Sequence, residues 1–398
     1  MSYLSLLHAY YGNKENYERL YEQRCAAEST RFLPIQIHDY PAFYCLCPEV
    51  YDLSAKIMVL DKQVSLIEQS LPGVALFQFA RKCLIDEIKL SCDIEHVYST
   101  RKELSDTLDS LETKKSGRFY GLVKRYNLLN QEHLPLNSCA DIRAIYDELV
   151  LEEVAKSSPD NVPDGAIFRK GLAEVTNSAQ KVIHRGAYPE AKIIQLMEQS
   201  LHILNDTDIP GVIRVSLFHY LFGYIHPFYD GNGRTSRFVS SFLLAREFNY
   251  LIGYRLSYTI KENVSAYYKA FQDCNDPKNR GDLTPFIILF LSIVRESFEK
   301  LLFALQRRNA ALAHYHHRIE RMNTLSVDEQ HFCDVLLQAT LFAEKGISKK
   351  TLGEVLGLSP STVDKRLAKL RSTILVEHKD ERPYTYTLDL AKLEQGCL

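Results

Sequence analysis

The chain has 398 residues, of which 46% are apolar and 25% charged, and its formal net charge is -2. These values are typical of a folded globular protein, and the length predicts two or three domains. The near-neutral balance excludes a basic field over the whole protein, and the longest dense apolar stretch, residues 285–294, is too short to cross a bilayer, so we expect no membrane partner.

The start of the chain and its cysteines both favour a cytoplasmic protein. Residues 1–12 lack the basic start and apolar run of a secretory signal. The nine cysteines are dispersed and lack metal-ligand spacing, which is typical of a reducing compartment. We therefore interpret them as packing residues.

Most of the chain has the periodicity of helices, and its character changes at a few points. Helices are expected at residues 74–95, 100–112, 189–204 and 212–225. We predict four segments: an N-terminal subdomain at 1–70, a helical segment at 71–115, a core at 116–310 and a C-terminal domain at 325–398. In the first of them, Pro34 and Pro41 are expected to interrupt regular structure.

Two stretches in the core favour strands. Residues 167–175 and 181–184 are followed by Arg185-Gly186, and together they predict a β-hairpin.

The last fifty residues predict a helix-turn-helix followed by a hairpin. Helices are expected at 349–356 and 360–370, strands at 373–377 and 384–388, and a polar tip at 378–383. This order is the outline of a winged helix. The second helix places a polar and basic set on one face: Ser361, Thr362, Lys365, Arg366 and Lys369. That face suits DNA, but winged helices also dock proteins, and the sequence leaves both alternatives open.

One twelve-residue stretch, HPFYDGNGRTSR at 226–237, gathers groups that suit nucleotide chemistry. Gly231 and Gly233 allow a sharp turn, and the helix that follows directs unpaired N–H groups into the turn, which favours phosphate. Arg234 and Arg237 share a helix face and can both bind phosphate oxygens. Each of these residues alone would be unremarkable; their combination in one short stretch indicates a site.

Two further groups in this stretch suit a transfer reaction. Asp230 offers a carboxylate that can hold Mg²⁺ against phosphates. His226 is a titratable base placed to accept a proton from an attacking hydroxyl.

The stretch resembles the Fic signature, HxFx(D/E)GNGRxxR, at every specified position. The resemblance implies a mainly α fold with a Fic-type helical core, a small β-hairpin flap and the appended winged helix-turn-helix domain. It also implies transfer of AMP from ATP to Ser, Thr or Tyr hydroxyls of target proteins and of the enzyme itself, with ATP and Mg²⁺ as cofactors. His226 would be the general base, Asp230 the metal ligand, and Phe228 the anchor of the loop. The implied ATP-binding residues in the stretch are Gly231, Asn232, Gly233, Arg234, Thr235, Ser236 and Arg237.

The resemblance extends to two flanking regions. The hairpin before the stretch looks like the family's flap, which pairs with the main chain of a target; its residues here are Val182, Ile183, His184 and Arg185. After the stretch, Tyr267, Tyr268 and Asn275 resemble the family's adenosine contacts, although tyrosine pairs on helices are often core residues.

A third region resembles an inhibitory helix with the pattern (S/T)xxxE(G/N). Ser91 and Glu95 fit it, and the resemblance implies that Glu95 contacts Arg237 and keeps it from the γ-phosphate. His96 departs from the pattern, because Gly and Asn tolerate a left-handed backbone best. That departure leaves the strength of the inhibition open.

Several alternatives remain open at this level. The chain could instead remove AMP, with Glu95 orienting a water molecule, or it could be a DNA-binding regulator whose core senses nucleotide. The expected partners are a target protein with an acceptor hydroxyl and, through the tail, DNA or another protein. The oligomeric state is not determined by the sequence, and a homodimer is one option.

Overall fold

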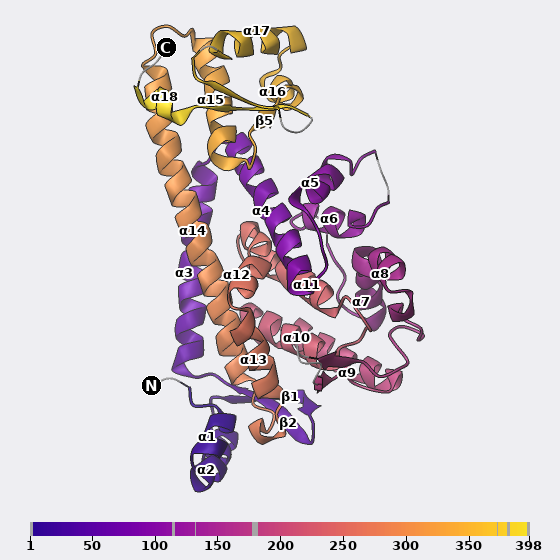
Figure 1. Cartoon of the computed structure of the whole chain (residues 1–398). Helices are drawn as coiled ribbons and strands as arrows, with labels where there is room; N and C mark the ends of the chain where they lie inside the picture. The colour runs from indigo at the N-terminus through magenta and orange to yellow at the C-terminus, as the bar shows by residue number, and fades with distance from the viewer. Residues whose placement is uncertain are drawn as a thin grey trace. The chain divides into compact units, whose positions relative to one another are not determined.

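The computed structural model describes residues 3–113, 116–131, 133–176, 182–371, 373–379 and 383–395. Its described part is mainly helical, with small antiparallel sheets of two or three strands (Figure 1). The predicted fold class is therefore confirmed at this level. Within these ranges no helix combines the length and the apolar character needed to cross a membrane.

The chain divides into two compact units. The first comprises Met1–Asp61 and Ile85–Glu299, and the second comprises Lys62–Leu84 and Lys300–Leu398. The boundaries fall inside the long helices α3 (Pro48–Ser70), α4 (Gly73–Ile94) and α14 (Thr284–Glu320). The four predicted segments stay a prediction, and the segment ends at residues 115 and 398 lie outside the described residues.

The first unit begins with two short helices and a β-hairpin. These are α1 (Leu6–Gly12), α2 (Lys14–Ala26), β1 (Thr30–Ile37) and β2 (Tyr40–Cys45). Pro34 and Pro41 lie inside the two strands, so the expected interruption is wrong. In a two-stranded sheet each strand keeps one free edge, where a residue without an N–H is tolerated. The register also shifts between Phe32 and Gln36, on either side of Pro34.

The rest of the first unit is helical apart from one short hairpin. In chain order its elements are α5 (Arg101–Asp109), α6 (Tyr120–Asn127), α7 (Cys139–Tyr146), a π-helical segment (Asp147–Leu151), α8 (Glu152–Ser157), β3 (Glu174–Thr176), β4 (Val182–Arg185), α9 (Glu190–Asn205), α10 (Gly211–Ile225), α11 (Asn232–Glu247), α12 (Leu256–Glu262) and α13 (Val264–Asn275), with 3-10 turns at Pro159–Asn161, Tyr250–Tyr254 and Pro277–Asn279. The four predicted helices correspond to α4, α5, α9 and α10.

Helix α10 lies in the core of this unit and leads directly into the signature loop. It packs against α9, α11 and α13 (Figure 1). Its sequence is apolar on nearly every side, so burial on most sides is favourable. A well-packed helix before the loop and another after it give the loop rigid ends.

The predicted strand at residues 167–175 is largely wrong. Only its last two residues belong to β3, which pairs with β4. The Glu190 carboxylate accepts hydrogen bonds from the main-chain N–H groups of Ala166, Ile167 and Phe168. These donors are therefore satisfied without a neighbouring strand. Lys181, at the start of the second predicted strand, lies outside the described residues.

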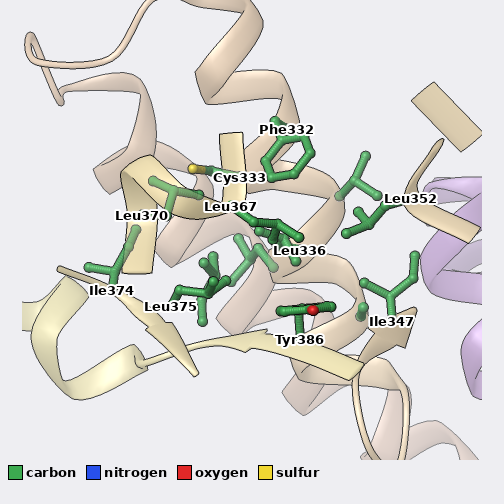
Figure 2. Packing of buried hydrophobic residues seen from close by; sticks show 14 of the residues in the cluster. Phe332, Cys333, Leu336, Ile347, Leu352, Leu367, Leu370, Ile374, Leu375 and Tyr386 are labelled. Carbon is green, nitrogen blue, oxygen red and sulfur yellow. The ribbon is translucent and has the colours of Figure 1, made fainter. Parts of the chain in front are cut away.

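The second unit contains α15 (Val327–Phe342), β5 (Ile347–Ser348), α16 (Lys349–Leu356), α17 (Pro360–Arg371), β6 (Leu375–His378), β7 (Thr385–Leu388) and α18 (Leu390–Gln395). The strands form an antiparallel sheet in the order β5-β7-β6. Figure 2 shows Leu336 of α15, Leu367 of α17 and Tyr386 of β7 in one buried cluster. The helices and strands of the last fifty residues lie where their sequence predicted them. Three residues of the predicted tip, Asp380, Glu381 and Arg382, are outside the described residues. The assignment of these helices and strands as a winged helix stays a prediction.

Candidate active site

The signature loop joins α10 to α11 and is closed by its own asparagine. Asn232 accepts a hydrogen bond from Phe228 N (3.0 Å) and donates one to Phe228 O (2.8 Å). Gly231 has φ 79°, and a Cβ there would lie 2.8 Å from Val150. Both the backbone and the space therefore require glycine at this position. The N-terminal N–H groups of α11 are thereby held toward the loop.

Phe228 anchors the loop in the core, as the resemblance implied. Its side chain is fully buried and stacks on Tyr146, with ring centroids 3.7 Å apart. Phe168 meets the same ring edge-on at 5.5 Å. The loop therefore rests on an aromatic platform built from two segments outside the signature.

Arg234 lies between two carboxylates. Its buried guanidinium forms ion pairs with Glu153 of α8 and with Asp230, the latter at 3.2 Å. Glu153 is itself buried and was missed by the sequence reasoning, since nothing in its local pattern distinguishes it from a surface glutamate. The Asp230 side chain keeps about a third of its surface exposed. Asp230 and Arg234, predicted as metal ligand and phosphate ligand, are thus neighbours.

Arg237 is held by three hydrogen bonds to Ser91 of α4 and to Glu95, which directly follows that helix. Its Nε donates to Ser91 Oγ (3.0 Å), its Nη2 to Ser91 O (2.8 Å) and its Nη1 to Glu95 Oε1 (2.7 Å). The Arg237 side chain is 1% exposed and that of Glu95 29%. The structure therefore brings together the three residues that the inhibitory pattern singled out.

The Glu95 carboxylate also covers the glycine of the loop. A Cβ at Gly233 would lie 1.9 Å from Glu95 Oε1 and 2.8 Å from Arg237 Nη1. The absence of a side chain at Gly233 is what lets Glu95 come so close. Burial and the charge of Glu95 raise the pKa of Tyr268 to about 12, which places this tyrosine in the same surroundings.

His96, which departs from the inhibitory pattern, nevertheless adopts the left-handed backbone, with φ 57°. The chain after the helix therefore adopts the conformation that Gly or Asn would favour. Histidine at this position raises the free energy of that conformation but does not change its geometry.

We expect His96→Gly to tighten the contact between α4 and Arg237. Relief of the left-handed strain should exceed the extra chain entropy of glycine by about 1 kcal/mol or less. The melting temperature should rise slightly. The matched change His202→Gly, inside α9, should lower the melting temperature, because glycine weakens a helix interior. A lower melting temperature for His96→Gly would contradict this account.

His226 stands at the start of the loop, in a left-handed conformation with φ 51°. Burial, reinforced by nearby His184 and by the charge of Arg169, lowers the pKa of His226 to about 3. The imidazole is therefore neutral at physiological pH, which is the form a general base requires.

The predicted flap is docked on the core through His184. The carbonyl of Tyr224 accepts a hydrogen bond from His184 Nε2 (2.7 Å), and Asn275 Nδ2 donates to His184 Nδ1 (3.2 Å). Val182 and Ile183 are partly buried, while exposed Arg185 pairs with Glu174 across the hairpin (2.9 Å).

The predicted adenosine residues do not form a single open surface. The Tyr267 side chain is buried and its hydroxyl is 2.7 Å from His219 Nε2, whereas Tyr268 is 37% exposed. The Asn275 amide is engaged by His184 and by Tyr220. Among the other predicted ATP-binding residues, Thr235 and Ser236 are buried on α11.

His219 gives this unit a predictable response to acid. It is fully buried between Ser240 Oγ (2.8 Å) and the Tyr267 hydroxyl, and burial, with the charge of Arg237, lowers its pKa to about 3. In the unfolded chain an imidazole takes up a proton near pH ~6.5. Between those values the unfolded state binds more protons, so the free energy of unfolding falls as pH falls.

His219→Gln should reduce the pH dependence of the free energy of unfolding, measured by urea denaturation, between pH ~6.5 and ~4.5. In that range one proton changes the free energy of unfolding by about 1.4 kcal/mol per pH unit. His202→Gln, at an exposed site, should not; equal slopes for wild type and His219→Gln would contradict the assignment.

The basic face predicted on α17 is largely paired within the second unit. Arg366 contacts Asp328 (3.5 Å), Lys369 contacts Glu329 (2.7 Å) and Arg371, at the end of the helix, contacts Glu377 (2.6 Å). Ser361 and Lys365 are exposed, and Thr362 is partly buried.

Comparison with known proteins agrees with the signature loop. The Fic/DOC family matches residues 136–244. Proteins named protein adenylyltransferase Fic from Drosophila melanogaster and Drosophila virilis are 32% identical over 114 residues, which is 29% of this chain. The match spans only 21% and 22% of those relatives, about a fifth of their length.

The fold of the chain is also found in a solved structure. A Fic family protein from Desulfovibrio desulfuricans G20 is similar over 87% of this chain and 97% of its own, with a TM-score of 0.54 and 21% sequence identity. That likeness concerns the fold. The sequence match places a Fic/DOC family region at residues 136–244 of this chain.

Proposed function

We propose that this chain is a protein adenylyltransferase that moves AMP from ATP to Ser, Thr or Tyr hydroxyls of target proteins and of itself, restrained by Glu95. The observation that carries the proposal is the loop at residues 226–237. This loop contains a neutral imidazole, a turn before the N–H groups of a helix, and Arg237, whose three side-chain nitrogens all donate to Ser91 or Glu95.

The chemistry that suits this arrangement is displacement at the α-phosphorus. The acceptor hydroxyl oxygen forms a bond to that phosphorus, the bond to the β-phosphate oxygen breaks, and pyrophosphate leaves. His226 takes the hydroxyl proton. The N–H groups at the start of α11, Arg234 and, once released, Arg237 stabilise the negative charge on the phosphates.

The residues present fit a magnesium ion bound mainly through the nucleotide. The structure has no cluster of three or more His, Cys, Asp or Glu side chains suited to a metal among its described residues. Mg²⁺ commonly uses one or two carboxylates with substrate phosphates and water, and Asp230 offers one partly exposed carboxylate beside the loop. When bound, the ion would neutralise phosphate charge.

The decisive experiment follows the label of ATP. The protein is incubated with Mg²⁺ and ATP labelled at the α-phosphate, with and without a cell lysate, and Glu95→Gly serves as the released form. We expect protein-bound label from α-labelled ATP and none from γ-labelled ATP. Label only from γ-labelled ATP would indicate phosphoryl transfer instead. Release of AMP from adenylylated protein, without any incorporation, would favour the reverse reaction.

For the tail we propose protein docking rather than DNA binding, because acidic partners already neutralise Arg366, Lys369 and Arg371. DNA phosphates would have to displace them.

The full-length protein should therefore give little or no gel shift with genomic fragments at physiological salt. Replacing Asp328 with Asn and Glu329 with Gln should free two cations, strengthen low-salt binding and steepen its salt dependence by about two units. A wild-type shift at physiological salt that Lys365→Glu removes would establish DNA binding instead.

A further inference from the structure

Arg169 is a fully buried arginine outside the signature loop, and the hydrogen bonds that its guanidinium makes to described residues all go to main-chain oxygens. Its Nε donates to His226 O (3.0 Å), its Nη2 to Ala187 O (2.8 Å) and its Nη1 to Gly171 O. Its own N–H donates to Pro227 O (3.3 Å). Arg169 thus forms hydrogen bonds to the start of the signature loop, to the segment after the flap and to the segment before the flap.

The charge of Arg169 is unusual for so buried a position. No carboxylate of the described residues forms an ion pair with it. Buried charges are costly unless paired, and burial accordingly lowers the pKa of Arg169. Three carbonyl oxygens take the place of the water molecules that would solvate the guanidinium. An apolar side chain could fill the same space without this desolvation cost.

The end of the flap comes very close to His226 at this point. Ala187 N donates to Ile225 O (2.9 Å), and Gly186 N donates to Ala173 O (3.0 Å). A Cβ at Gly186 would lie 2.9 Å from His226 Cβ and 2.4 Å from Arg169 Nη2. The glycine therefore lets the flap, the base and the arginine meet.

We propose that Arg169 is a positioning residue for the transfer: it fixes the main chain of His226 against the end of the flap, so that the base faces the hydroxyl that the flap presents. This proposal rests on the proposed function. A displacement of about 1 Å between base and acceptor is enough to lower a rate by about a hundredfold.

The electrostatic surroundings of His226 agree with this role. Burial is the largest influence that lowers the pKa of His226, and among the described residues the charged or titratable groups His184, on β4, and Arg169 lower it further. A cation near the imidazole disfavours its protonation. Arg169 therefore both orients the base and helps to keep it neutral.

The test compares Arg169→Lys, which keeps a charge but cannot reach three oxygens, with Arg169→Met, which removes the charge. Tyr229→Phe is the matched control. The Tyr229 hydroxyl accepts from Gly171 N (2.7 Å) and donates to Asp164 (3.1 Å), so this change loosens the same segment without removing a cation. Two readouts are taken: the titration of His226 by NMR of imidazole-labelled protein, assigned with His226→Gln, and the kcat and KM of AMP transfer.

Arg169→Met should raise the pKa of His226 by about one unit or more. Arg169→Lys should leave that pKa within about half a unit while lowering kcat by about a hundredfold, with KM for ATP unchanged. Tyr229→Phe should not move the titration. If Arg169→Met does not fold, the kcat of Arg169→Lys alone tests the positioning role.

Wild-type kcat in Arg169→Lys, or an equal titration shift in Tyr229→Phe and Arg169→Met, would overturn the positioning role. The kinetic readout is taken in the Glu95→Gly background. If the Glu95→Gly protein itself transfers no AMP, the proposed function is refuted, while the titration, which needs no activity, still tests how Arg169 acts on His226.

Discussion

Replacement of His226 by alanine will abolish measurable AMP transfer while the fold and ATP binding persist. The imidazole is neutral at physiological pH and stands at the start of the signature loop, where we propose that it accepts the hydroxyl proton. Loss of a positioned base lowers rates by about 10²–10⁴-fold. The proposed phosphate ligands lie elsewhere in the loop, so nucleotide affinity should change little. Label incorporation and calorimetric ATP binding measure the two effects separately, in the Glu95→Gly background to give a signal.

The matched control for this change is His202→Ala. His202 is an exposed histidine of α9, outside the loop, and its replacement should leave transfer at the parent level. Transfer by His226→Ala at the parent level would remove this histidine from the mechanism. Loss of both transfer and ATP binding would point to a collapsed loop instead, which the melting temperature would reveal.

The signature loop was predictable because its information is local. Turn-forming glycines, an asparagine that closes the turn and two arginines one helical turn apart all act within twelve adjacent positions. The sequence could also indicate the proximity of Glu95 and Arg237, but only through resemblance, since 142 positions separate them.

The partners of the loop were not predictable, because they are ordinary residue types brought near by the fold. Glu153 lies 81 positions from Arg234, and Arg169 lies 57 positions from His226. Neither belongs to a pattern that distinguishes it from a solvated side chain. The strand expected at 167–175 failed for a related reason: a glutamate from a later helix satisfies the main-chain donors there. Long-range side-chain to main-chain bonds override local strand preference.

Glu95→Gly is expected to raise AMP transfer by about 10–10²-fold. Glu95 acts on the site in two ways: it accepts a hydrogen bond from Arg237, and its carboxylate covers Gly233. A charged hydrogen bond contributes about 1.5–3 kcal/mol, and each 1.4 kcal/mol is a tenfold change in population. Removal of the side chain releases one donor of Arg237 and opens the space above the turn.

Two further variants separate charge from shape. Glu95→Gln keeps the size of the side chain and an oxygen that can accept from Arg237, so it should activate less than Glu95→Gly. Ser91→Ala removes one of three bonds to Arg237 and leaves the main-chain oxygen of residue 91 and Glu95 in place, so its effect should be smaller still.

Arg237 decides whether Glu95 acts through this contact. If Glu95 restrains transfer by occupying Arg237, then Arg237→Ala should not activate, and the double variant should resemble Arg237→Ala, since no γ-phosphate ligand remains to be released. If Glu95 acts only by covering Gly233, the double variant should be activated like Glu95→Gly. Initial rates of label incorporation at equal protein concentration distinguish these cases. Equal rates for wild type and Glu95→Gly would mean that the contact between α4 and the loop does not restrain the enzyme at all, because a carboxylate that limits nucleotide binding cannot be removed without a gain in rate.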